Sequence, residues 1–151
     1  MDDVERRSRN MSMIKGRDTR PEVAVRSYLF SKGFRFRKND RRYPGKPDIV
    51  LPKYRTVIFV NGCFWHRHQG CRFATVPKSN VGFWQAKFER NQQRDIRDYS
   101  QLEAMGWNVI VLWECQLRPK TKADTLLGLE CRITGEEYIA GENEPEYGGS
   151  L

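Results

Sequence analysis

Potential metal ligands crowd into one short stretch of the sequence, Val60–Cys71 (VNGCFWHRHQGC). Cys63, His68 and Cys71 offer two thiolates and an imidazole within nine residues, and zinc prefers such ligands in a tetrahedral arrangement. The fourth ligand has to come from elsewhere, and Cys115, just after a second apolar segment, is the best candidate. Four protein ligands would make a closed, structural zinc site. The alternative is that these cysteines are small buried side chains and His68 a hydrogen-bonded loop histidine.

Other groups nearby indicate metal-assisted hydrolysis. Asp48 begins a predicted strand after the turn YPGKP, where an exposed carboxylate could hold Mg²⁺. The next predicted strand ends at Val60, shortly before Asn61 and His66. Because neighbouring strand ends lie close together, Asp48 and His66, the histidine left outside the zinc set, could meet there. The alternative is that Asp48 only serves the turn and that Glu22 only caps a helix.

Hydrophobic periodicity predicts the elements that would position these groups. Segment 19–33 begins with a capping box and ends at a glycine, which is typical of a helix. Segment 34–51 predicts a hairpin-like pair of strands, while 56–60 and 109–113 are short apolar runs typical of buried central strands. Between these runs, 83–106 predicts a long amphipathic helix. Its expected apolar face consists of Trp84, Phe88, Ile96, Tyr99 and Leu102.

The elements together predict an α/β fold, with a central mixed β-sheet flanked by α-helices. A chain of 151 residues suits a single domain, which we expect to span residues 1–123. Within it, residues up to about 18 form a basic arm that orders on a partner. Residues 124–151 form an acidic C-terminal tail, predicted to be partly disordered.

The net charge of +8 is unevenly distributed along the chain. Seven acidic residues and one basic residue follow residue 123, which leaves a charge of +14 on the first 123 residues. Such localised positive charge favours a nucleic acid as partner, because bound lysines and arginines release the counterions condensed on phosphates. The alternative is a merely solubilising surface. No segment approaches the roughly 18 apolar residues of a membrane span, and the N-terminus is unlike a signal, so we expect a soluble intracellular protein.

Several separated motifs resemble the very short patch repair (Vsr) endonucleases, a family of T:G mismatch nickases. They are NMSMIKGRDTRPE, YPGKPDIVLPKYRTVIFVNGCFWHRH, FWQAKFERNQQRD and LEAMGWNVIVLWECQLR, in the family's order and over most of residues 10–118. The resemblance implies a restriction-endonuclease-like fold, one structural Zn²⁺ and Mg²⁺-dependent nicking 5′ to the thymine of a T:G mismatch. Such mismatches arise when 5-methylcytosine is deaminated. The resemblance therefore also implies double-stranded DNA as partner, a functional link to a cytosine-5 DNA methyltransferase, a monomer, and a cytoplasmic, nucleoid-associated location in a bacterial cell.

The resemblance also implies roles for individual residues. Asp48 would bind Mg²⁺ together with the backbone carbonyl of Val60, and the catalytic cluster would include Glu22, His66 and the position of Asn61. The zinc ligands would be Cys63, His68, Cys71 and Cys115. The DNA-binding residues would be Phe64, Trp65 and Trp84, which wedge between base pairs, and Met11 and Ile14 of the arm, which enter from the other groove. From the residues alone, Trp84 could equally be helix core and Phe64-Trp65 a loop plug.

The chain departs from the family's well-studied form at one catalytic position, where Val60-Asn61 replaces Thr-His. An asparagine amide orients its neighbours through hydrogen bonds but transfers no proton near neutral pH. Two other functions therefore stay open beside the mismatch nickase. One is a nickase of the same fold associated with restriction, and the other is a zinc-stabilised DNA-binding module without activity.

Overall fold

The computed structural model describes residues 19–135 of the chain. Met11, Ile14 and the rest of the predicted arm lie outside the described residues, as does the chain beyond residue 135. The described part is a mixed four-stranded sheet with three α-helices, so the predicted α/β class is confirmed.

The sheet has the strand order β1-β2-β3-β4. Its strands are β1 (Arg37–Lys38), β2 (Ile49–Leu51), β3 (Thr56–Asn61) and β4 (Asn108–Trp113). β2 pairs antiparallel with both β1 and β3, with Val50 opposite Val57, which confirms the predicted strand pair in 34–51. β3 and β4 are parallel and in register over six residue pairs. Their carboxyl ends therefore meet at one edge of the sheet, where the loop after Asn61 begins.

The prediction of two central strands is right for β3 and wrong for β4, which lies at an edge of the described sheet. The apolar run in β4 has another cause, because helices cover this strand on both faces. Ile110 and Leu112 point into a core on one side, while Val109 and Val111 pack against a second core on the other. A run of apolar residues reports coverage of both faces and not the position of a strand within the sheet.

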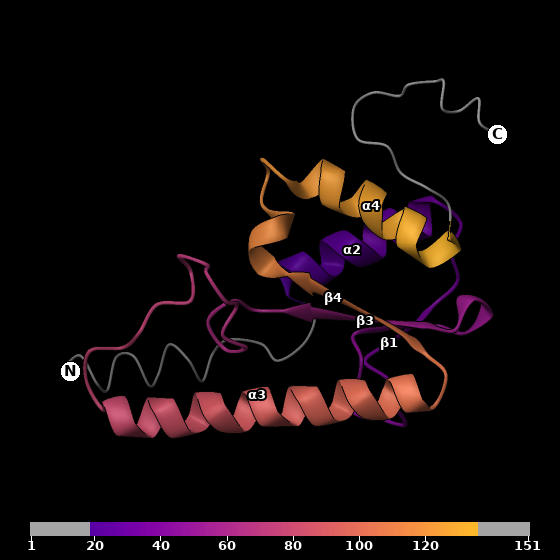
Figure 1. Cartoon of the computed structure of the whole chain (residues 1–151). Helices are drawn as coiled ribbons and strands as arrows, with labels where there is room; N and C mark the ends of the chain where they lie inside the picture. Colours follow the sequence, from indigo (N-terminus) through magenta and orange to yellow (C-terminus); the bar gives the residue numbers. More distant parts are fainter. Residues whose placement is uncertain (1–18, 136–151) are drawn as a thin grey trace.

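The three helices form two layers around the sheet (Figure 1). α2 (Arg20–Ser31) and α4 (Lys122–Thr134) lie on one face, and the long α3 (Val81–Ala104) crosses the other. Two short 3₁₀ turns, η1 (Pro52–Tyr54) and η2 (Glu114–Leu117), follow β2 and β4. α3 links the parallel strands β3 and β4. One face of this helix looks toward the end of the sheet at which both strands terminate.

The start of α2 follows from its local sequence. Thr19 Oγ1 accepts a hydrogen bond from Glu22 N at 3.4 Å, and Glu22 Oε1 accepts from Thr19 N at 3.3 Å. This reciprocal pair is the predicted capping box, which satisfies two otherwise unpaired helix N–H groups. The cap also fixes the carboxyl group of Glu22 at the sheet edge.

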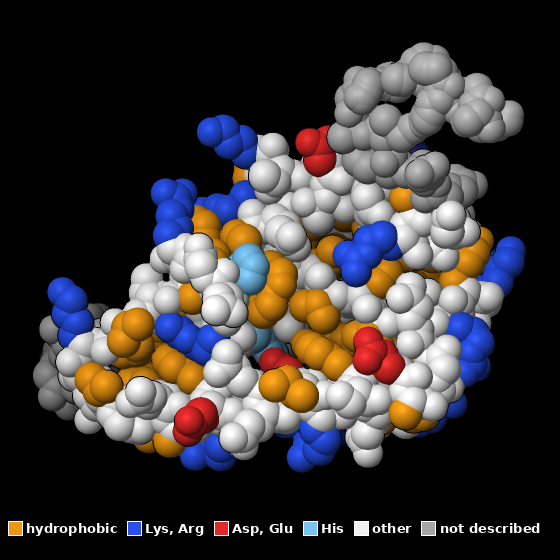
Figure 2. Space-filling view, viewed as in Figure 1, with side chains coloured by type: hydrophobic (Ala, Val, Ile, Leu, Met, Phe, Trp, Pro, Cys, Tyr) orange, Lys and Arg blue, Asp and Glu red, His pale blue; other side chains and the backbone are white. Residues whose placement is uncertain are grey.

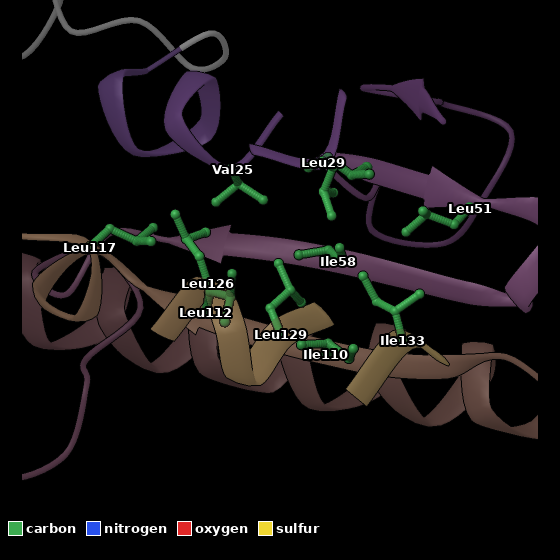
Figure 3. Close-up of a cluster of buried hydrophobic side chains, with 11 residues drawn as sticks. Val25, Leu29, Leu51, Ile58, Ile110, Leu112, Leu117, Leu126, Leu129 and Ile133 are labelled. Atoms are coloured by element: carbon green, nitrogen blue, oxygen red, sulfur yellow. The ribbon is translucent and has the colours of Figure 1, made fainter. Parts of the chain in front are cut away.

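The larger core lies between the sheet and the pair α2 and α4 (Figure 3). It consists of Val25, Leu29, Ile49, Leu51, Ile58, Ile110, Leu112, Leu117, Leu126, Leu129 and Ile133. Each fully buried aliphatic side chain of this kind contributes about 1.5–3 kcal/mol of burial free energy. Three of these residues come from α4, so residues 124–134 of the expected tail form a helix packed on the core. The division of the chain at residue 123 remains a prediction.

The long helix predicted over 83–106 is confirmed as α3, but part of its predicted apolar face is wrong. Ile96 is 65% exposed, because it lies about a third of a turn away from the row that begins with Trp84. Asn91 and Asp98 are buried in that row. Polar side chains occupy the inner face in the middle of α3 because they look toward the sheet edge and not into the core.

Candidate active site

A cavity of about 510 Å³ opens at the carboxyl end of β3. Its lining contains the residues predicted for catalysis and for the magnesium site, together with two of the predicted wedge aromatics: Glu22, Asp48, Val60, Asn61, Phe64, Trp65 and His66. They come from α2, the start of β2, the end of β3 and the following loop. Figure 2 shows a hollowed part of the surface where histidine and acidic side chains lie among hydrophobic ones, with lysines and arginines toward the rim. The structure thus brings together residues that are far apart in the sequence.

Two carboxyl groups lie together at the floor of this cavity. Asp48 Oδ2 accepts a hydrogen bond from Val60 N at 2.6 Å, which ties the start of β2 to the end of β3. Burial, and to a smaller extent the nearby Glu22 carboxyl, raises the pKa of Asp48 to about 7, against the opposing effects of the Val60 N–H and Lys46. Glu22 is only 2% exposed, and its Oε2 lies 3.6 Å from Arg26 Nη1. Two carboxyl groups this close together favour a bound cation.

His66 is held by an acidic residue that the sequence analysis did not identify. Its Nδ1 lies 2.6 Å from Asp95 Oδ2 of α3, and both side chains are largely shielded from solvent. When Nδ1 carries the proton that this carboxylate accepts, Nε2 is left as a free base. Because His66 also lines the cavity, its ring can move a proton there while Asp95 fixes its orientation.

Asn61 is also held from α3. It is 5% exposed, and its Nδ2 donates a hydrogen bond to the Tyr99 hydroxyl at 2.8 Å. The Tyr99 ring packs against Phe59 with a centroid separation of 4.8 Å, so the hydroxyl has a fixed position. Burial raises the pKa of Tyr99 above its usual range, which keeps the phenol neutral. With the amide nitrogen engaged, the Asn61 side chain retains an oxygen that can only accept hydrogen bonds.

The predicted wedge aromatics form one cluster beside the cavity. The Phe64 ring lies 5.1 Å from Trp65 and 5.7 Å from Trp84, and Trp65 lies 5.9 Å from Trp84, between centroids. Phe64 and Trp65 are half-buried, whereas Trp84 is 8% exposed within α3. The Trp65 carbonyl accepts a hydrogen bond from Asn91 Nδ2 at 3.1 Å, which anchors this loop on the helix.

The four predicted metal ligands also come together. One potential ligand atom from each of Cys63, His68, Cys71 and Cys115 lies within 4.8 Å of the others, so the cluster could hold a metal ion. His68 Nδ1 is 3.7 Å from Cys63 Sγ and 3.4 Å from Cys115 Sγ, and its ring stacks on Trp113 at 4.2 Å. Burial raises the pKa of Cys63 to about 12, so a thiolate there requires a cation.

The sequence analysis missed three residues of this region. Asp95 and Tyr99 lie on α3 and contact His66 and Asn61, and Glu114 of η2 lines the cavity. The helical phase could have indicated Asp95, because 84, 88, 91, 95, 98 and 102 repeat at spacings of three and four and combine polar with apolar residues. No local signal distinguishes Glu114 from any other acidic residue after a strand.

Comparison with known proteins identifies the family. A model described as DNA mismatch endonuclease Vsr matches residues 1–72. The DNA mismatch endonuclease Vsr of Escherichia coli strain K12 is 45% identical over 136 residues, which cover 90% of this chain and 85% of the relative. The chain belongs to the Vsr family of DNA mismatch endonucleases. The resemblance seen in the separated motifs is thereby confirmed.

Two other relatives of this chain are named as type II nicking enzymes. V.NmeAIP of Neisseria meningitidis is 53% identical over 115 residues, covering 76% of this chain and 81% of the relative. V.XorIIP of Xanthomonas oryzae pv. oryzae is 50% identical over 113 residues, covering 75% of the chain and 82% of the relative. This Vsr chain is accordingly a nicking endonuclease that acts on DNA. None of the helices within residues 19–135 is long and apolar enough to cross a membrane.

Proposed function

We propose that this Vsr protein nicks double-stranded DNA 5′ to the thymine of a T:G mismatch in a Mg²⁺-dependent reaction. The observation that carries the proposal is that Asp48, His66 and the aromatic pair Phe64-Trp65 line one and the same cavity. A phosphodiester held at the carboxyl pair would lie beside a base for proton transfer and beside apolar rings that can enter the base stack. Repair of deaminated 5-methylcytosine is the task that such a nick serves.

The oxygen atoms at the cavity floor suit Mg²⁺. We propose Asp48 and the backbone carbonyl of Val60 as ligands, with Glu22 beside them. Within the described residues, Glu22 Oε2 is buried without a hydrogen bond, which is a state that a hard cation or its water shell relieves. Bound there, Mg²⁺ would polarise the scissile phosphate and acidify a water molecule. The Val60 N–H holds the Asp48 carboxylate in place through Oδ2.

Proton transfer falls to His66, since Asn61 cannot perform it. Asp95 accepts from the protonated Nδ1 and stabilises the imidazolium that forms when Nε2 takes a proton. Asn61, with its nitrogen engaged by Tyr99, accepts hydrogen bonds through its oxygen and can orient a water or a hydroxyl group. Glu22, at the capped N-terminus of α2, places a second carboxyl group beside Asp48.

Mismatch selection is assigned to the aromatic cluster. Phe64 and Trp65 line the cavity, and inserting their rings between base pairs costs least where stacking is already weak, as at a mismatch. Trp84 is buried behind Phe64, so we propose that it joins the wedge when the cluster opens on DNA. Met11 and Ile14 are proposed to enter from the opposite groove.

The cluster of Cys63, His68, Cys71 and Cys115 suits Zn²⁺. Tetrahedral zinc with Zn–S bonds of about 2.3 Å and Zn–N bonds of about 2.05 Å separates a sulfur and a nitrogen ligand by about 3.6 Å. The two separations from His68 Nδ1, 3.7 and 3.4 Å, bracket that value. Four protein ligands leave no open position, so zinc would fasten η2 to the loop after β3 and take no part in hydrolysis.

The remaining proposals concern the molecule as a whole. The mixed sheet with its metal site at one edge supports a restriction-endonuclease-like fold, with the nuclease in residues 1–123. An enzyme that repairs deaminated 5-methylcytosine would act as a monomer on the nucleoid in the cytoplasm of a bacterial cell. It would also depend functionally on the cytosine-5 DNA methyltransferase that creates its substrates.

One assay separates this function from the two alternatives. Labelled duplexes carrying T:G, T:A or C:G at the same position are incubated with the protein and Mg²⁺. Selective nicking of T:G supports the proposal. Indiscriminate cutting, or cutting of the duplexes without a mismatch, supports a nickase of the same fold associated with restriction. Binding without product supports a DNA-binding module.

A further inference from the structure

A second cavity, of about 460 Å³, adjoins the first, and apart from His66 and Asp95 the charged residues that line it have no part in the chemistry described so far. The two cavities share three lining residues, Gly45, Phe59 and His66. The other residues that line the second cavity come from the turn before β2 and from α3: Arg41, Tyr43, Lys46, Arg94, Asp95, Arg97 and Asp98. We call this second cavity the turn–α3 cleft. His66 lies at the boundary between this cleft and the first cavity.

The boundary between the two cavities is built by a close approach of backbone to helix. Gly45 has a φ of +77°, and a Cβ atom there would lie 3.0 Å from Asp98 Cβ and 3.2 Å from Phe59 Cε1. Only glycine adopts this conformation at this distance without strain. The turn therefore rests directly on α3, and Lys46 follows it at an exposed position beside the cleft.

Positive charge dominates the turn–α3 cleft. Both acidic residues are engaged, Asp95 by His66 at 2.6 Å and Asp98 by Arg97 at 3.5 Å. Arg94 Nη2 donates to Asn91 Oδ1 at 2.9 Å, which leaves most donors of its guanidinium group for another partner. Arg41 is exposed and forms no close ion pair with any carboxylate in residues 19–135. The cleft thus offers at least two arginines to an anion.

We propose that the turn–α3 cleft binds the backbone phosphate next to the scissile phosphate on the nicked strand. This inference rests on the proposed function, because it takes the scissile phosphate to lie at Asp48. A DNA strand that leaves the first cavity over Gly45 enters the turn–α3 cleft at the boundary that the two cavities share. Arg41 and Arg94 then pair with its phosphate oxygens, a contact that guanidinium groups make well. By holding this phosphate, the cleft fixes which phosphodiester of the DNA strand lies next to His66.

The test uses the full chain with Arg41→Gln and Arg94→Gln combined, and Arg132→Gln on α4 as the matched control. Arg132 is exposed on the helix that packs on the opposite face of the sheet. Binding to a T:G duplex is measured in an Asp48→Ala background from low to moderate salt. The double variant should lower the magnitude of the slope of log K against log salt by about 0.9, since both arginines contact the same phosphate and each lost phosphate contact removes about 0.9. The control should leave the slope unchanged.

Methylphosphonate substitution locates the contact. A neutral methylphosphonate is placed singly at each phosphate flanking the expected nick. At one adjacent position the methylphosphonate should weaken DNA binding about tenfold in the Asp48→Ala protein that keeps both arginines. It should not change DNA binding by the double arginine variant. A purely structural effect of losing the Arg94–Asn91 bond would not vanish when one phosphate is neutralised. An unchanged slope, or the absence of any coupled position, overturns the inference. If the protein with Asp48 intact nicks T:G but neither effect is seen, only the proposed role of the cleft is refuted. If both effects are seen but the protein with Asp48 intact does not nick, only the proposed function is refuted.

Discussion

Replacing Asp48 by asparagine should change how the stability of the Mg²⁺-free protein depends on pH. The pKa of Asp48 is raised from 3.8 to about 7 in the folded protein, mainly by burial. Between these two values the folded state binds one proton more than the unfolded chain, so stability falls as pH rises from about 4 to about 7. Three pKa units correspond to about 4 kcal/mol. Because Asp48 is only partly buried, this value is an upper bound, and about 2 kcal/mol is the smallest effect we expect.

The asparagine side chain of this variant cannot ionise, so the loss of stability with rising pH disappears. We expect the unfolding free energy of Asp48→Asn, minus that of the parent, to grow by about 2–4 kcal/mol between pH 4 and pH 7.5. Urea denaturation without Mg²⁺ or chelator measures the difference, and the common histidines and other acids largely cancel in it. Adding Mg²⁺ at pH 7.5 should stabilise only the parent, because the cation binds the ionised carboxylate. A difference that stays constant with pH would show that Asp48 is an ordinary solvated acid and would refute the buried carboxyl pair.

Further predictions follow from the other parts of the site. His66→Ala should slow single-turnover nicking by roughly 10²–10⁴-fold across pH 6 to 9, and Asn61→Ala clearly less; equal rates for His66→Ala and the parent would remove His66 as the base. Trp65→Ala should reduce discrimination between T:G and T:A duplexes, whereas an equal loss on both would assign this ring to packing alone. The purified protein should contain one zinc per chain by elemental analysis, and Cys115→Ala should lose both the metal and much of its stability; well-folded protein without zinc would contradict the site.

The parts of the fold that the sequence predicts are those with local causes. The capping box of Thr19 and Glu22 needs only residues three apart, and the β-branched run 56–60 needs only burial on both faces. The position of β4 at an edge of the sheet depends on pairing between distant segments, which its own apolar run does not report. The same run would occur in a central strand.

The site was predictable where its residues flank strands and unpredictable where they come from a helix. Asp48 and His66 could be placed together because β2 and β3 pair antiparallel, so that the start of β2 and the end of β3 share one cavity. Asp95 and Tyr99 were overlooked as site residues because the inner face of the helix was expected to be apolar throughout, an expectation that the buried Asn91 and Asp98 contradict. In the middle of α3 the inner face meets the cavity and not the core, so its polar residues contact His66 and Asn61.

The central claim is that the carboxyl pair at Asp48 positions one phosphodiester, beside the thymine of a T:G mismatch, for cleavage. The most direct measurement maps the cut at nucleotide resolution on an end-labelled T:G duplex, with the parent and with Asp48→Ala. We predict one product from the parent, cut 5′ to the mismatched thymine in one strand only, and no product from Asp48→Ala, which should still bind this duplex. Cleavage at the same position by Asp48→Ala, or a parent cut unrelated to the thymine, would contradict the account.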